Sequence, residues 1–135
     1  MRRVLRSQSD YRSTTLRNQL TSLVLYEAVV TNSGKAKALE SYANHFFNKA
    51  KVGDLAAKKL AHQTFLDKNA TKKTFEDILP RYKSGVTTFV RSLATTPRVG
   101  DNAARRVVML IEAAKIEPKK EAAPKETKTT KKAQG

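Results

Sequence analysis

Apolar residues recur at helical spacing in the first part of the chain. Over residues 13–26 they return every three or four positions, the period of one buried helix face (Leu16, Leu20, Leu23 and Val24). A short β-branched run at 29–31 then predicts a brief strand. Ser33 and Gly34 break the chain after it and offer a helix N-cap.

Residues 35–51 have the clearest helical pattern. Lysine, glutamate and asparagine lie off a single stripe of small and large apolar residues, which is formed by Ala36, Leu39, Ala43, Phe46, Phe47 and Ala50. Gly53 suits the position just past the end of this helix. Asp54 suits the N-cap of the next one, which is predicted at 55–66.

A loop is predicted at 67–70, followed by a short helix. Thr71 is the expected N-cap of that helix, and the chain should leave it near Pro80. Its inward-facing residues are expected to be Phe75, Ile78 and Leu79.

The apolar period then changes to that of strands. Residues 87–93 and 105–112 are rich in β-forming side chains, and the second run is apolar nearly throughout. Between them, residues 95–103 hold the turn-forming residues Pro97, Gly100, Asp101 and Asn102. This order predicts an antiparallel hairpin.

The last residues differ in composition. Residues 117–135 contain prolines, lysines, alanines and threonines but no large apolar side chain, so we expect a disordered tail. The chain is therefore divided into a basic N-terminal arm (1–12), a globular domain (13–116) and this tail (117–135).

Charge narrows the function more than the helices and strands do. The 27 lysines and arginines exceed the 12 aspartates and glutamates, which gives a formal charge of +15, and the isoelectric point is about 10.3. A polyanion such as nucleic acid is the expected partner of such a chain. No secretory signal and no apolar run of spanning length occurs, so we expect a cytoplasmic protein without a membrane partner.

Residues that could support catalysis are few. Cysteine is absent, and the two histidines, His45 and His62, lie on different predicted helices without a partner motif. Glu76 and Asp77 are adjacent and therefore point to different sides of a helix. We expect no enzyme activity, no metal, no cofactor and no small-molecule substrate.

Basic residues gather in two places that suit RNA. An N-terminal group of arginines surrounds Tyr11, and a planar guanidinium pairs with phosphates and stacks on bases (Arg2, Arg3, Arg6, Arg12 and Arg17). The second group combines an aromatic ring with basic side chains around the hairpin (Arg81, Tyr82, Lys83, Arg91 and Arg98). A solvated terminus remains open for the first group, and a core position remains open for Tyr82.

A series of short motifs resembles the bacterial large-subunit ribosomal protein L-seventeen family. In order, the series is Arg17-Asn18-Gln19, Ser22-Leu23, Tyr26-Glu27, Val30-Thr31, Lys35-Ala36-Lys37-Ala38-Leu39, Ala50-Lys51-Val52-Gly53-Asp54-Leu55, Pro80-Arg81-Tyr82 and Arg98-Val99-Gly100-Asp101-Asn102-Ala103. The resemblance covers about residues 6–114. One departure is Phe89, which stands where the family commonly has a tyrosine.

The resemblance implies one α/β (α+β) domain of two layers, with about four helices packed on a small three-stranded mixed sheet. It also implies a structural role in the large ribosomal subunit, in contact with its RNA and with neighbouring ribosomal proteins. RNA contact is carried over to Arg12, Arg17, Asn18, Lys35, Lys37, Arg81, Tyr82, Arg91 and Arg98.

Two other functions fit the composition. The first alternative is a basic nucleoid protein that coats DNA, although no helix-turn-helix spacing is present. The second is an enzyme acting on nucleic acid, which would need a clustered acid, base or metal set that the sequence lacks.

Overall fold

The computed structural model describes residues 8–82 and 85–111. Four α-helices and three strands follow each other in the order α1 (Gln8–Tyr26), β1 (Ala28–Asn32), α2 (Ser33–Ala50), α3 (Leu55–Thr64), α4 (Lys68–Lys73), β2 (Val90–Thr95) and β3 (Arg105–Leu110). After α4 the chain continues through a π-helical turn, η1 (Thr74–Ile78), and a 3-10 turn, η2 (Leu79–Arg81).

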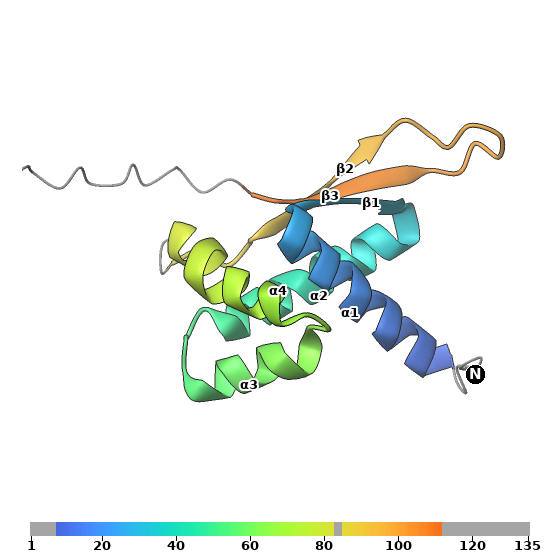
Figure 1. Ribbon diagram of the computed structural model, residues 1–135. Coiled ribbons are helices and arrows are strands. Elements are labelled where there is room, and N and C mark those ends of the chain that lie inside the picture. Colours follow the sequence, from blue (N-terminus) through green and yellow to red (C-terminus); the bar gives the residue numbers. More distant parts are fainter. Residues whose placement is uncertain (1–7, 83–84, 112–135) are drawn as a thin grey trace, which may run out of the picture.

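The domain has two layers, a sheet and a set of helices on one of its faces (Figure 1). Alternation along β1 explains this arrangement, because Val29 packs against the core while Val30 points away and is 55% exposed. Helices α1 and α2 contact the sheet, and α3 and α4 pack against those two helices. The expected α+β domain with a three-stranded sheet is confirmed.

The sheet is antiparallel throughout, whereas the resemblance implied a mixed one. Its order is β1-β3-β2, and β3 pairs antiparallel with both neighbours. Strands β1 and β2 consequently run in the same direction, but β3 lies between them, so no parallel pair forms. The expected hairpin is the β2–β3 pair.

Phenylalanine rings form the centre of the core. Phe47 on α2 is fully buried and lies 5.5 Å from the ring of Phe89, which is 1% exposed. Phe46 contacts the ring of Phe65 edge-on at 4.9 Å and so joins α2 to the end of α3. Phe89, which departs from the family's common tyrosine, is therefore a core residue just before β2.

Asn44 on α2 determines where β2 begins. Its Oδ1 accepts hydrogen bonds from the backbone N–H groups of Phe89 (2.8 Å) and Val90 (3.0 Å), and its Nδ2 donates to the carbonyl of Val90 (3.3 Å). Asn48, one turn later, donates to the carbonyl of Thr87 at 2.7 Å. Thr87 and Phe89 thus bond to side chains of α2, and the strand starts at Val90, later than the expected 87.

Two helix starts differ from the sequence prediction. Helix α1 begins at Gln8, so residues 8–12 of the expected arm are helical. Asp67 caps α4 by accepting from the N–H of Asn69 at 2.8 Å, which makes the loop expected at 67–70 wrong. Thr71 is buried inside α4 and is not its cap. Asp54 caps α3 as predicted, with 2.7 Å to the N–H of Leu55.

Candidate nucleic-acid interface

Backbone and side-chain contacts bring three separate segments to one end of the sheet. The N–H of Ser33, at the start of α2, donates to the carbonyl of Ala104 at the base of the hairpin (3.1 Å). Gln19 on α1 donates to Thr31 of β1 at 3.0 Å. Figure 1 shows that the first half of α1, the start of α2 and the hairpin loop all lie on the right-hand side of the molecule.

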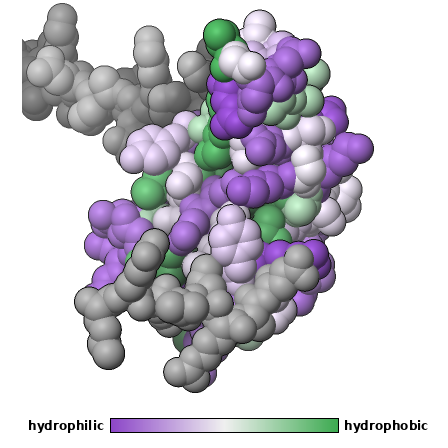
Figure 2. Space-filling view, turned by 90° about the vertical axis from the view of Figure 1, so that its right-hand side faces the viewer, coloured by the Kyte–Doolittle hydropathy of each residue, from purple (hydrophilic) through white to green (hydrophobic). Residues whose placement is uncertain are grey.

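Five basic residues belong to this end, and we call it the basic side. It is formed by Arg12, Lys35, Lys37, Arg98 and Arg105. Figure 2 looks onto the right-hand side of Figure 1, where hydrophilic residues cover much of the visible described surface. Arg12 belongs here because it lies two helical turns before Gln19 on the same stripe of α1.

The start of α2 favours an anion. Lys35 and Lys37 are exposed near its start, its first turn contains no acidic residue, and Asn32 makes no side-chain capping bond there. The N-terminal end of a helix already carries a partial positive charge from its unsatisfied N–H groups. Two lysines at this end therefore raise the local potential where a phosphate is the natural counter-charge.

In the hairpin loop, Arg98 is paired within the chain. Its guanidinium binds both carboxylate oxygens of Asp101, with 3.0 Å from Nε to Oδ1. The pKa of Asp101 is lowered, first by this bond and then by the N–H of Ala103. Arg105 donates instead to the carbonyls of Thr96 and Pro97 at 3.3 and 3.5 Å. Arg105, which the sequence prediction does not select, therefore contributes a charge at the base of the hairpin that no carboxylate of the described residues neutralises.

Arg17 lies away from the basic side and has a structural contact. Its Nε donates to the carbonyl of Thr64 at 3.0 Å and its Nη2 to that of Gln63 at 2.5 Å, at the C-terminal end of α3. Cations are favoured at that end of a helix because the last carbonyls have no helical partner. Asn18, the next residue, is exposed.

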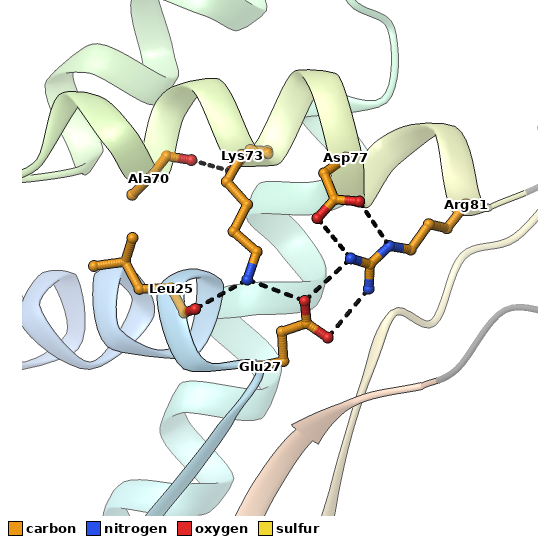
Figure 3. Close-up of polar contacts among 7 residues, drawn as sticks. Leu25, Glu27, Ala70, Lys73, Asp77 and Arg81 are labelled. Carbon is orange, nitrogen blue, oxygen red and sulfur yellow. Dashed lines mark hydrogen bonds and ion pairs between the residues drawn. The ribbon is translucent and has the colours of Figure 1, made fainter.

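Arg81 belongs to a closed group of two cations and two carboxylates (Figure 3). It forms a fork of two 3.1 Å bonds to Glu27 and a second fork to Asp77 at 3.2 and 2.6 Å. Lys73 binds Glu27 at 3.0 Å and the carbonyl of Leu25 at 2.9 Å. Hydrogen bonds donated by Arg81 and then by Lys73 lower the pKa of Glu27, and donation to Glu27 and then to Asp77 raises the pKa of Arg81.

Tyr82 packs into the edge of the core. Its hydroxyl donates to the carbonyl of Ile111 at 2.7 Å, and its ring meets Phe89 edge-on at 4.9 Å. Burial is the main reason why the pKa of Tyr82 is raised above its ordinary value of 10.0. Of the two readings of this residue, the contacts favour the core position.

The remaining residues that were predicted to contact RNA fall into two groups. Arg91 is exposed on the face of the sheet away from the helices and forms no ion pair within residues 8–82 and 85–111. Arg2, Arg3 and Arg6 lie outside the described residues.

The described part of the chain contains no group of three or more histidine, aspartate or glutamate side chains placed to hold a metal ion. Among the same residues, no helix has both the length and the apolar character needed to cross a bilayer.

A small α+β domain with lysines and arginines gathered at one end of its sheet belongs to the class of compact, basic nucleic-acid-binding proteins. The family model described as Ribosomal protein L17 matches residues 15–111, and the chain belongs to this family.

Curated relatives align with the chain over most of its length. The chain is 37% identical over 109 residues to the large ribosomal subunit protein bL17 of Caldanaerobacter subterraneus, covering 81% of this chain and 97% of that protein. The protein of the same name from Endomicrobium trichonymphae is 37% identical over 103 residues, with 76% and 88% covered. That of Trichlorobacter lovleyi is 35% identical over 106 residues, with 78% and 86% covered.

Proposed function

We propose that the chain is a structural constituent of the large ribosomal subunit and that it binds ribosomal RNA through the basic side. The family match over residues 15–111 carries the first part of the proposal. Lys35, Lys37, Arg98 and Arg105 lie on segments at one end of the sheet, with the first half of α1, which carries Arg12, on the same side of the molecule, and this supports the second.

Binding works by neutralising phosphates on a rigid frame. The lysines of α2 supply point charges beside a helix N-terminus, and Arg105 presents a guanidinium that is held by two carbonyls. Each neutralised phosphate releases counterions, so affinity must fall as salt rises. Because the hairpin and α2 are tied together at Ser33, the domain holds the bound RNA in a defined local shape.

Arg2, Arg3 and Arg6 are proposed as further RNA contacts, because they precede in the sequence the start of α1 at Gln8, which lies on the basic side. The partners of the chain are large-subunit RNA and neighbouring ribosomal proteins, and its location is the ribosome. It acts by binding and catalyses no reaction. Asn18 is proposed as a further contact from an exposed position, whereas Arg17, Arg81 and Tyr82 support the surface by stabilising the domain.

The test is RNA binding by charge-matched variants. The double variant Lys35→Ala/Lys37→Ala removes two charges from α2, and Lys58→Ala/Lys59→Ala removes the same two charges from exposed positions on α3. Each lost phosphate contact should reduce the slope of log affinity against log salt by about 0.7–0.9. We expect that reduction for the α2 variant on large-subunit RNA, and little change for the α3 variant.

Equal losses in both variants would mean that binding follows total charge and not the basic side. Equal competition by duplex DNA would favour the nucleoid alternative. In each case circular dichroism should first establish that both variants retain the fold.

A further inference from the structure

The face of the sheet opposite the helices is apolar at its centre. The register places Val107 of β3 between Val30 of β1 and Leu93 of β2, so three apolar side chains form one row across all strands. Val30 is 55% and Leu93 45% exposed. Figure 1 shows every described helix on the other face, so no described segment covers this one.

Two neighbouring rows complete this surface, which we call the outer sheet face. One row holds Ala28, Met109 and Arg91, and the other holds Asn32, Arg105 and Thr95. That these rows point outward follows from Ser92, whose hydroxyl reaches Glu40 of α2 at 2.6 Å on the helix side. The outer sheet face therefore has an apolar centre, an arginine in each flanking row and no carboxylate.

This composition is a poor match for RNA. Bases stack on aromatic rings, and none of the nine residues of the face is aromatic. Phosphates bound at the two arginines would leave the central row of valine and leucine in water. A protein side chain of apolar character removes that row from water, at about 25 cal/mol per Å² of apolar area covered.

Charge and apolar content exclude two other occupants of the outer sheet face. A second copy of this chain brings the same two arginines and no carboxylate to the contact, so the charges repel. Residues 112–135 carry seven lysines against four glutamates and a single large apolar residue, Ile116, and therefore match neither the arginines nor the apolar row. What fits is a chain with apolar residues beside a carboxylate.

We propose that the outer sheet face docks a segment of a neighbouring ribosomal protein, with its apolar residues on Val30, Val107 and Leu93 and a carboxylate on Arg91, while Arg105, at the other end of the face, belongs to the RNA-binding basic side. The row crosses three strands, a span of about 10 Å. This inference rests on the proposed function, because the partner is supplied by the assembled subunit.

The experiment places a photoreactive residue on the face of the full chain. Leu93 is replaced by p-benzoylphenylalanine, which keeps the position apolar, and Val30 is replaced in the same way as a second site. Leu66, which is 60% exposed between α3 and α4, is the matched control. Large subunits carrying each variant are isolated and irradiated, and the adducts are digested with nuclease or protease.

We expect an adduct at Leu93 and at Val30 that joins the chain to a different protein, survives nuclease and is lost on protease treatment. Adding Arg91→Glu should reduce its yield several-fold. Exclusion of both face variants from subunits that accept the Leu66 variant also supports docking at this face. An adduct removed by nuclease, an adduct of two copies, or no adduct at either site in subunits that contain the variant overturns the proposal.

Failure of the proposed function would look different, since the unsubstituted chain and the Leu66 variant would then be absent from large subunits as well.

Discussion

The guanidinium of Arg81 donates two parallel hydrogen bonds of 3.1 Å to the carboxylate of Glu27, although 54 residues separate the two in sequence. Glu27 joins α1 to β1 with a φ of 63°, a left-handed conformation that non-glycine residues seldom adopt. Its carbonyl also accepts from the N–H of Leu110 at 3.1 Å. This pair therefore fixes the junction between the helical layer and the sheet.

The ion pairs of Glu27 with Arg81 and Lys73 should make the free energy of unfolding depend on pH in the acidic range. The pKa of Glu27 is below its ordinary value of 4.5 in the folded chain, so its contribution is fully present above pH 4.5 and is lost as pH falls through the lowered value. At pH 7, Glu27→Gln should reduce the free energy of unfolding by about 1 kcal/mol, after allowing for partial exposure. The difference from the wild-type chain should shrink towards pH 3 in urea titrations.

The matched control for that experiment is Glu76→Gln, which changes an exposed carboxylate on η1 that forms no ion pair within the described residues. A difference between wild type and Glu27→Gln that does not vary with pH would show that the pairing with Arg81 and Lys73 is energetically unimportant.

Arg17 offers a direct contrast between a structural role and an RNA contact. Arg17→Ala should lower the free energy of unfolding by about 1–2 kcal/mol, because the charged hydrogen bonds to Gln63 and Thr64 are lost. Arg17→Lys should recover little of this, since an ammonium group lacks the fork that reaches two consecutive carbonyls. Urea unfolding measures both. If Arg17→Ala leaves the free energy of unfolding unchanged but reduces the salt dependence of RNA binding, Arg17 belongs to the RNA interface.

Tyr82 should behave as a core residue. Tyr82→Phe keeps the ring against Phe89 and removes the bond to the carbonyl of Ile111, so we expect a loss of about 1 kcal/mol in stability. In an absorbance titration at alkaline pH, the variant should lack the tyrosine that ionises above pH 10.0. A variant with wild-type stability and weakened RNA binding would instead support a base-stacking role.

Substitution of Asn44 should reduce the stability of the domain more than substitution of most other polar residues. Asn44→Ala leaves the N–H groups of Phe89 and Val90 without a partner in a buried place, at a cost of about 2–3 kcal/mol. Asn44→Asp retains the accepting oxygen and should lose less. Thermal unfolding of both variants, with Asn48→Ala as the neighbouring control, tests this. Similar melting temperatures for all three would mean that β2 does not depend on Asn44.

Local patterns were sufficient for most of the helices and strands. The apolar stripe of α2 and the capping residue Asp54 were predicted correctly because their evidence lies within one or two helical turns. The start of α4 was missed because Asp67 and Thr71 offer similar capping chemistry, and only packing distinguishes them. Likewise, the antiparallel sheet depends on which strand is central, which spacing along the chain does not encode.

The candidate interface was harder to predict, for a physical reason. Arg17 and Arg81 bind groups that lie 46 to 54 residues away in the sequence. The basic residues around them therefore suggested RNA binding, because the sequence does not show which groups of the same chain they contact. Glu27 gave no signal either, because a left-handed turn is usually marked by glycine or asparagine. Arg105, in contrast, is the first of two arginines that open an otherwise apolar strand, a local feature that the sequence does display.

The central claim, that this chain is an integral part of the large ribosomal subunit, is tested most directly by sedimentation of the tagged protein from cell lysate. The gradients compare magnesium that keeps ribosomes joined with magnesium low enough to split them. We predict that the protein follows the large subunit under both conditions and resists a moderate-salt wash. A protein that stays at the top of the gradient, or that travels with DNA, would contradict the claim.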